Sequence, residues 1–294
     1  MSFEVQRGNP RCGLPLCNIS PLAISATAAT LLEHKVCTVS SRHRQGASLS
    51  IPGSPDLVYV SAPGQGLLPL HVIVAHHQLA QILEQEPEVD AGANGSPGWS
   101  FALAGVKRFT VRIHPDPEGM RLRRTATAVE AMALWLCAQP LDANGLGQPA
   151  ATVLAAGNRW QRVFEPALGH GEDAVLSLLG RGSGTTPAGD DFLVGALAYA
   201  WAREGRQAGI IKRVGALEDE FAKVTTATSA TYLRAALQGL FSSHLVSFAR
   251  ALPRAGWEEI LLRAERITGH GSTSGFDTLT GFLAAARFES RPLR

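Results

Sequence analysis

Residues 180–201 read GRGSGTTPAGDDFLVGALAYAW, a glycine-rich run that passes directly into an apolar one. Four glycines fall between positions 180 and 189, and glycine lets a backbone bend sharply and approach a ligand closely. Thr186 and Pro187 suit the cap and the first turn of a helix. From Asp190 to Trp201 the apolar and alanine positions follow helical periodicity. The stretch therefore predicts a polar loop that opens a helix.

The same periodicity continues through the C-terminal half of the chain. The predicted helices cover residues 125–137, 173–179, 190–201, 214–221, 229–251, 257–267 and 276–285. The N-terminal half instead has short alternating runs bounded by Gly and Pro, which is the pattern of strands and turns. After a helix over residues 21–34, we expect strands at 35–41, 48–51, 57–60 and 70–74, a loop at 90–98, and a hairpin formed by 99–104 and 108–113.

These elements predict an α+β protein of two domains. Residues 1–124 form a β-rich N-terminal domain, as a small barrel or curled sheet. Residues 125–294 form a mainly α-helical domain that carries the glycine-rich motif with its two aspartates.

The composition indicates a globular protein. Of its 294 residues, 45% are hydrophobic and 18% are charged, which is enough apolar material for a core. A net charge of +2, from 27 basic and 25 acidic residues, predicts neither a nucleic-acid nor a membrane partner. The best apolar run, residues 67–74, is too short to span a bilayer. Four cysteines lack zinc-binding spacing and no signal peptide is visible, so we expect a cytoplasmic protein with reduced thiols.

Asp190 and Asp191 are the candidate catalytic residues. Backbone N–H groups at the start of a helix favour an anion, whereas two carboxylates in the first turn repel one. An amide-bearing acid satisfies both halves, with its carboxylate on N–H groups and its amide on an aspartate. A divalent cation such as Mg2+ on the two carboxylates is an alternative. A plain helix cap is a further alternative that requires no ligand, but it does not explain the four glycines.

Two further hydroxyl-rich segments, residues 225–229 and 270–277, precede predicted helices in the same half of the chain. We expect the three helix starts to converge on one pocket. The candidate substrate-binding residues are the glycines, hydroxyl residues and acid of these segments: Gly182, Ser183, Gly184, Thr185, Thr186, Gly189, Thr226, Ser229, Ser274, Gly275 and Asp277.

Residues 180–195 resemble the signature of the AllH-like family, a former family of unknown function whose members are also labelled carboxylases. Its pattern is Gly-x-Gly-x-Gly-x-Thr-Pro-Ser-Gly-Asp-Asp-Phe-hydrophobic-x-Gly, and this chain departs from it with Ala188 in place of Ser. The segment 274–281 is also similar, as is the run that begins at Thr225-Thr226. The resemblance is specific over residues 180–281 and loose before about residue 125.

The resemblance implies a β-rich N-terminal region and a helical C-terminal one. It also implies a subunit of oxamate carbamoyltransferase that acts with two other proteins in purine nitrogen catabolism. A carbamoyl group moves between oxalurate and phosphate, giving oxamate and carbamoyl phosphate. We therefore expect partner protein subunits and a small amide-bearing acid or phosphate anion as ligand. The alternatives are a metal-dependent phosphate-handling or hydrolytic enzyme using Asp190 and Asp191, and a non-catalytic metabolite-binding or assembly subunit.

Overall fold

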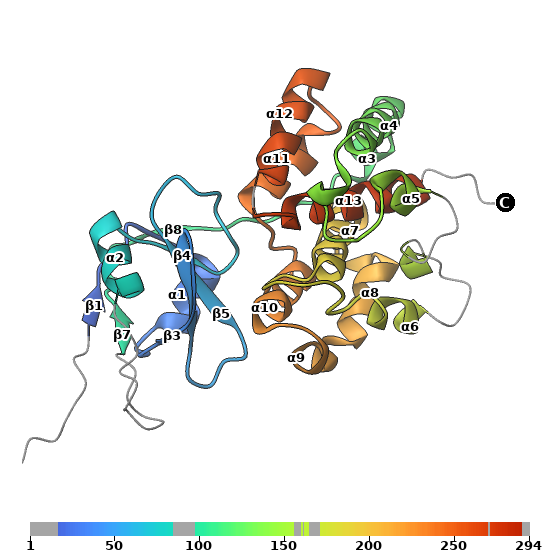
Figure 1. The fold of residues 1–294 in the computed structure, drawn as a ribbon. Helices are drawn as coiled ribbons and strands as arrows, with labels where there is room; N and C mark the ends of the chain where they lie inside the picture. The colour runs from blue at the N-terminus through green and yellow to red at the C-terminus, as the bar shows by residue number, and fades with distance from the viewer. Residues whose placement is uncertain are drawn as a thin grey trace, which may run out of the picture.

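A computed structural model describes residues 17–84, 98–155, 160, 162–164, 171–269 and 271–289 of the chain (Figure 1). A β-rich N-terminal part and a helical C-terminal part lie side by side, so the predicted α+β class is confirmed. All but the last residue of the predicted loop at 90–98 lies outside the described residues. In the described part, no helix combines the length and the apolar character needed to cross a membrane.

The N-terminal part is built on a six-stranded mixed sheet in the order β3-β4-β5-β6-β2-β8. Pairing is parallel between β5 and β6 and between β2 and β8, and antiparallel at the other steps. β1 and β7 form a separate parallel pair. The strands are β1 (Cys17–Ile19), β2 (Ala23–Ser25), β3 (Thr38–His43), β4 (Gly46–Ser50), β5 (Leu57–Ser61), β6 (His71–Ile73), β7 (Trp99–Phe101) and β8 (Lys107–Phe109).

This sheet is open rather than closed. Among the described strands, β3 and β8 end the six-stranded sheet and do not pair with each other, so the barrel alternative is wrong. Helices α1 (Ala26–Leu32) and α2 (His76–Glu84) accompany the sheet. Their buried residues, such as Leu32 and Ile82, join Leu49, Val58 and Val72 in one hydrophobic core.

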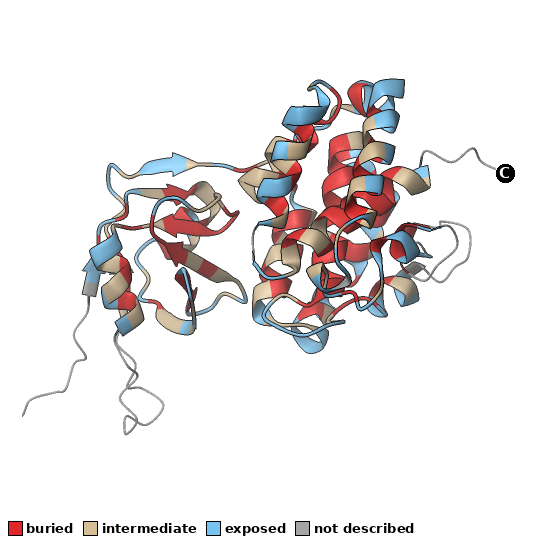
Figure 2. Ribbon diagram, turned by 45° about the horizontal axis from the view of Figure 1, so that its top comes forward, coloured by how far each residue is buried: buried red, intermediate tan, exposed pale blue. Residues whose placement is uncertain are grey.

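The C-terminal part is helical throughout, and its centre is α7. Nearly every residue of α7 is buried, as Figure 2 shows by colour, and its apolar residues face neighbours on all sides. The helices are α3 (Pro117–Arg121), α4 (Arg123–Cys137), α5 (Ala150–Leu154), α6 (Gly171–Leu176), α7 (Ala188–Glu204), α8 (Gly209–Ala216), α9 (Phe221–Val224), α10 (Ala227–Leu237), α11 (Ser243–Ala251), α12 (Trp257–Thr268) and α13 (Ser274–Glu289).

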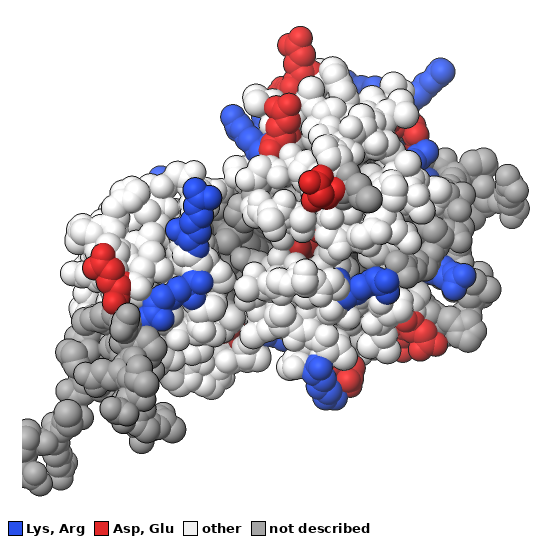
Figure 3. Space-filling model, in the orientation of Figure 1, with Lys and Arg blue, Asp and Glu red and all other residues white. Residues whose placement is uncertain are grey.

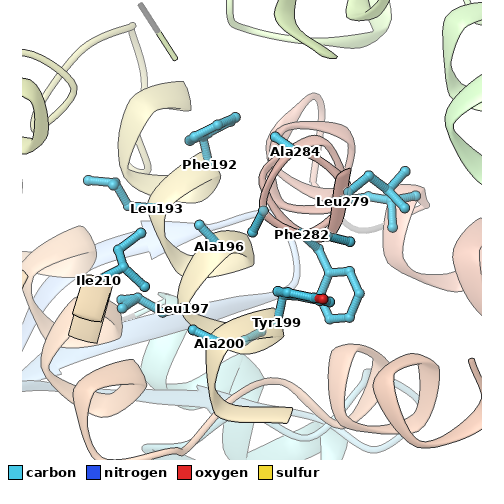
Figure 4. Close-up of a cluster of buried hydrophobic side chains, with 14 of the residues drawn as sticks. Phe192, Leu193, Ala196, Leu197, Tyr199, Ala200, Ile210, Leu279, Phe282 and Ala284 are labelled. Carbon is cyan, nitrogen blue, oxygen red and sulfur yellow. The ribbon is translucent and has the colours of Figure 1, made fainter. Parts of the chain in front are cut away.

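Helices α7 and α13 cross in close contact through two glycines. A Cβ atom on Gly195 would overlap the carbonyl oxygen of Thr278, and one on Gly281 would overlap the carbonyl oxygen of Phe192. Around this crossing, the rings of Tyr199 and Phe282 pack edge to face with centroids 5.4 Å apart (Figure 4). The crossing therefore sets how the starts of the two helices lie relative to each other.

Four predicted elements are wrong in detail. The helix expected over 214–221 spans the end of α8, a 3-10 turn at Glu218–Glu220 and the first residue of α9. Residues 21–34 contain strand β2 before helix α1, because β2 pairs with β6 and β8. The helix expected over 229–251 is two helices, since Gly239 turns the chain with a φ of 78°. Strands β7 and β8 do not form a hairpin, because β7 pairs with β1 and β8 pairs with β2.

We propose that the chain divides into two domains, and its two hydrophobic clusters support a division. The helical cluster already includes Ile113 and Met120, so these clusters favour a boundary before Ile113 over the predicted position near residue 124. Two residues at the C-terminal end of α10 and just after it, Ala235 and Leu240, pack into the hydrophobic cluster of the sheet. The side chain of Arg234 pairs with Asp56 at 2.6 Å, and the backbone N–H of Leu57 donates to the Thr231 hydroxyl at 3.0 Å. These contacts hold the sheet against α10.

Candidate functional site

A cleft of about 690 Å³ lies between the sheet and the helical part. Its helical wall is formed by the loop at residues 183–186, by Asp191 of α7, by Tyr232 of α10 and by residues 271–275 at the start of α13. The opposite wall comes from the β3–β4 turn, from Tyr59 of β5 and from residues 65–69. Segments far apart in the sequence therefore meet around one polar space.

The loop before α7 alternates in backbone conformation. Gly180, Gly182 and Gly184 have φ angles of 68°, 119° and 93°, whereas the residues between them are not in the positive-φ region. Such alternation turns successive N–H groups toward one side, an arrangement that binds anions. Within the described residues, the N–H groups of residues 182–186 donate no hydrogen bond. The loop thus offers free donors beside the cleft.

Asp191 is the only Asp or Glu among the described residues that line the cleft. Its carboxyl group is buried, and its Oδ2 atom accepts no hydrogen bond from the described residues. Burial raises the pKa of Asp191 well above its usual value, and the neighbouring Asp277 and Asp190 raise it further. The hydroxyls of Ser274 and Thr186 act in the opposite direction. A buried oxygen without a partner, on a residue that lines a cleft, is a candidate acceptor for a ligand donor.

Asp190, by contrast, is engaged by the protein itself. Its Oδ1 accepts a hydrogen bond from the Gly180 N–H at 2.8 Å, and its Oδ2 accepts one from the Thr225 hydroxyl. Burial raises the pKa of Asp190, while the hydroxyls of Thr225 and Ser229 and the Gly180 N–H lower it. Asp190 is absent from the lining of the cleft and holds the glycine loop from behind. These contacts suit Asp190 to position the loop, and its catalytic role stays a prediction.

The sequence Gly-x-Asp-x-Leu-x-Gly occurs at the start of both α7 and α13, and Asp277 of α13 occupies the position of Asp191. Asp277 is fully buried and accepts hydrogen bonds from the Gly145 N–H at 2.9 and 3.1 Å. Burial raises the pKa of Asp277 to about 7, against the lowering effect of the Gly145 and Leu146 N–H groups and the Thr273 hydroxyl. One aspartate of the repeated motif therefore fixes a loop, whereas the other faces the cleft.

Hydrogen bonds connect the three hydroxyl-rich helix starts. The hydroxyls of Thr186 and Ser274 lie 2.7 Å apart, which joins the start of α7 to that of α13. The Thr226 hydroxyl donates to the Thr185 carbonyl at 2.6 Å and accepts from the Ser229 N–H at 3.1 Å, so it caps α10 and holds the loop before α7. The three segments form one connected wall.

The predicted site residues thus separate into two groups. Those that line the cleft are Ser183, Gly184, Thr185, Thr186, Asp191, Ser274 and Gly275. Those that do not line it are Gly182, Gly189, Asp190, Thr226, Ser229 and Asp277. Gly189 has a packing role, because a Cβ there would overlap the carbonyl oxygen of Leu178.

Sequence reasoning missed the residues that other segments bring to the cleft. These include His43 and Arg44 of the β3–β4 turn, Tyr59, Tyr232 and His244. Burial lowers the pKa of His43 and raises that of Tyr59. The pKa of Tyr232 is raised by burial and, to a smaller extent, by the negative charges of Tyr59 and Asp191 when these are ionised.

The described residues do not provide a clear metal site. Among them, no three His, Cys, Asp or Glu side chains gather as metal ligands. Of the two carboxylates in the Mg2+ hypothesis, only Asp191 faces the cleft, since both oxygens of Asp190 already accept hydrogen bonds from Gly180 and Thr225. Arg181, a conceivable partner for these acids, lies instead over the Trp160 ring, 5.8 Å from its centroid.

Comparison with known families identifies the segment that builds this wall. No solved structure matches the chain significantly. The family model described as oxamate carbamoyltransferase subunit AllH matches residues 178–286. That range begins just before the glycine loop and contains α7, α10 and nearly all of α13. Over residues 178–286 the chain is therefore similar to the AllH family, which supports the resemblance seen in the sequence motifs.

Proposed function

We propose that this chain is a subunit of an oxamate carbamoyltransferase and that its cleft binds the reactants of carbamoyl transfer. The family description supports the subunit role, and partner protein subunits follow from it. The single observation that carries the proposed site is the buried Asp191, which lines the cleft beside free backbone N–H groups and whose Oδ2 has no partner among the described residues.

The raised pKa of Asp191 gives its carboxyl group a specific recognition chemistry. A neutral carboxylic acid has one O–H donor and keeps acceptor capacity on its other oxygen. A primary amide has the complementary pair, a carbonyl acceptor and an N–H donor. The carbamoyl end of oxalurate carries this group, and oxamate bound alone, without a carbamoyl group in the site, presents a primary amide of the same kind. Asp191 therefore binds the carbamoyl amide through two hydrogen bonds, which a carboxylate ligand without an amide cannot form.

The loop at residues 182–186 supplies the second half of the site. Its N–H groups bind a phosphate oxygen beside the amide held by Asp191. In the transfer from oxalurate, a phosphate oxygen attacks the carbamoyl carbon and forms a C–O bond. The bond from that carbon to the oxamate nitrogen breaks, and the proton of hydrogen phosphate passes to this nitrogen. The products are carbamoyl phosphate and oxamate, and the chain contributes positioning and charge stabilisation.

The proposal places the protein in the cytoplasm, where thiols stay reduced. Cys37 and Cys137 are both free, and burial raises the pKa of each thiol, to about 11 for Cys37. Raised pKa values keep the two groups as unreactive thiols at neutral pH.

The first test is a thermal-shift screen of the purified chain with oxamate, oxalurate, carbamoyl phosphate, phosphate and oxalate, each with and without Mg2+. A ligand that binds only the folded state raises the melting temperature. We expect oxamate and phosphate to raise it, and oxalate to raise it less, because oxalate lacks the amide. Stabilisation only by Mg2+ with phosphate would favour the metal-dependent alternative. No response to any amide acid would contradict the proposal and leave an assembly subunit.

A further inference from the structure

The turn between β3 and β4 presents one arginine to the cleft from a fixed position. His43 and Gly46 are the last paired residues of the hairpin, so Arg44 and Gln45 form its two-residue loop. The ring of Tyr59 covers Gly46 so closely that a Cβ there would come within 2.6 Å of the ring's Cζ. The Nε2 atom of His43 lies 3.1 Å from the Ser41 hydroxyl and 3.0 Å from that of Ser48. These contacts hold the turn in place.

Arg44 is also the only Lys or Arg among the described residues that line the cleft. In the part of the chain that the structure describes, it forms no ion pair, so its charge is available to a ligand. Basic side chains on the face shown in Figure 3 stand apart from one another, without a continuous basic patch. A single arginine inside a cleft is therefore a local feature of the site.

The proposed reaction brings together two anions, which repel each other at close range. A site that binds both needs two separate anion-binding elements. The loop at residues 182–186 is one such element, on the same wall as Asp191. The β3–β4 turn is the other, on the opposite wall.

The position of Asp191 decides which anion each element binds. Phosphate must lie beside the carbamoyl carbon that it attacks, and the neighbour of Asp191 on its own wall is the glycine loop. An amide acid whose amide lies on Asp191 extends its carboxylate across the cleft. Tyr59 and Tyr232 also line the cleft, and their hydroxyls stay neutral because burial raises both pKa values. Arg44 is the cation that the described lining offers to this carboxylate.

We propose that Arg44 binds the carboxylate of the amide acid while the loop at residues 182–186 binds phosphate. This assignment rests on the proposed function and makes the N-terminal domain the part that selects the acid. Its guanidinium group has the paired N–H donors that suit a carboxylate.

Calorimetric titration of the full-length chain with oxamate and, separately, with phosphate tests the assignment. Arg44→Gln should weaken oxamate binding at least about tenfold, the usual effect of losing a hydrogen bond to a charged group, and should change phosphate binding less than about twofold. Gly184→Ala should weaken phosphate binding at least about tenfold and change oxamate binding less than about twofold. The reason is that Gly184 has a φ of 93°, so a Cβ there strains the loop, although it meets no neighbour. Arg42→Gln is the control, since Arg42 lies on the same hairpin but not in the cleft lining.

The possible results distinguish a failure of the role of Arg44 from a failure of the proposed function. Oxamate binding that survives Arg44→Gln, or phosphate binding lost together with it, would overturn the role of Arg44. If the wild-type chain binds neither anion, the proposed function itself fails. Arg44 is exposed, so the urea unfolding midpoint of Arg44→Gln should equal that of the wild type and show that the fold is intact.

Discussion

Replacing Gly195 by alanine tests the close crossing of α7 and α13. The added Cβ would overlap the Thr278 carbonyl oxygen and lie 2.8 Å from the Phe282 backbone nitrogen. Both atoms belong to the backbone of α13, so the two helices must separate to relieve the overlap. Overpacking costs about 1–3 kcal/mol or more, against about 1 kcal/mol gained because alanine favours a helix. Since backbone must move here, we expect a net loss of about 2 kcal/mol in the free energy of unfolding.

The matched control is Gly215→Ala in α8, where the nearest atom to the new Cβ is a methyl carbon of Leu237 at 3.8 Å. This variant gains helix preference without overlap and should be more stable by about 0.5 kcal/mol. Urea unfolding followed by tryptophan fluorescence reports both changes, because Trp160 and Trp201 are buried in the same helical core. The Gly195→Ala midpoint should fall and the Gly215→Ala midpoint should not. Equal midpoints for the two variants would refute the close crossing.

Three further predictions concern the site. Thr226→Ala should lower the free energy of unfolding by about 1 kcal/mol in urea titrations, since it removes the α10 cap, whereas Thr226→Ser should retain most of it. Asp277 has a folded pKa of about 7, above its unfolded value, so its contribution to stability is present at low pH and is lost as pH rises from about 4 to 7. Unfolding measured across this range should show a negative slope that is smaller in Asp277→Asn, and equal slopes would contradict the buried neutral carboxyl. Because burial raises the pKa of Asp191 and its neutral form binds the amide, oxamate affinity should fall with rising pH in the wild type but not in Asp191→Asn. A flat wild-type profile in calorimetry would argue against that protonation state.

The helical half was largely predictable because its signals are local. Apolar periodicity and the glycine and proline stops predicted α7 and α13 well. The errors occurred where distant contacts decide the structure: β2 forms inside a predicted helix only because β6 and β8 pair with it. The β7–β8 hairpin failed for the same reason, since each strand has a different partner far along the chain. The local pattern of polar and apolar residues does not indicate which distant strands pair.

The site residues likewise separate into those with a local sequence signal and those brought together by distant contacts. The glycine loop and Asp191 were found because glycine, hydroxyl and acid residues adjoin one another in the sequence. Adjacent residues on a helix point about 100° apart, so Asp190 and Asp191 face different surroundings although they look equivalent in sequence. Arg44 and Tyr232 could not be found, because only the packing of the sheet against α10 brings them together.

The proposed function depends most directly on Asp191 as the amide-binding group. Calorimetric titration of the wild type and Asp191→Ala with oxamate and with oxalate tests this, because the two ligands share a carboxylate and differ in the amide. Asp219→Ala, which changes an exposed acid outside the cleft, serves as the control. We expect Asp191→Ala to weaken oxamate at least about tenfold and to change oxalate little. Equal losses for both ligands, or undiminished oxamate binding, would contradict the claim.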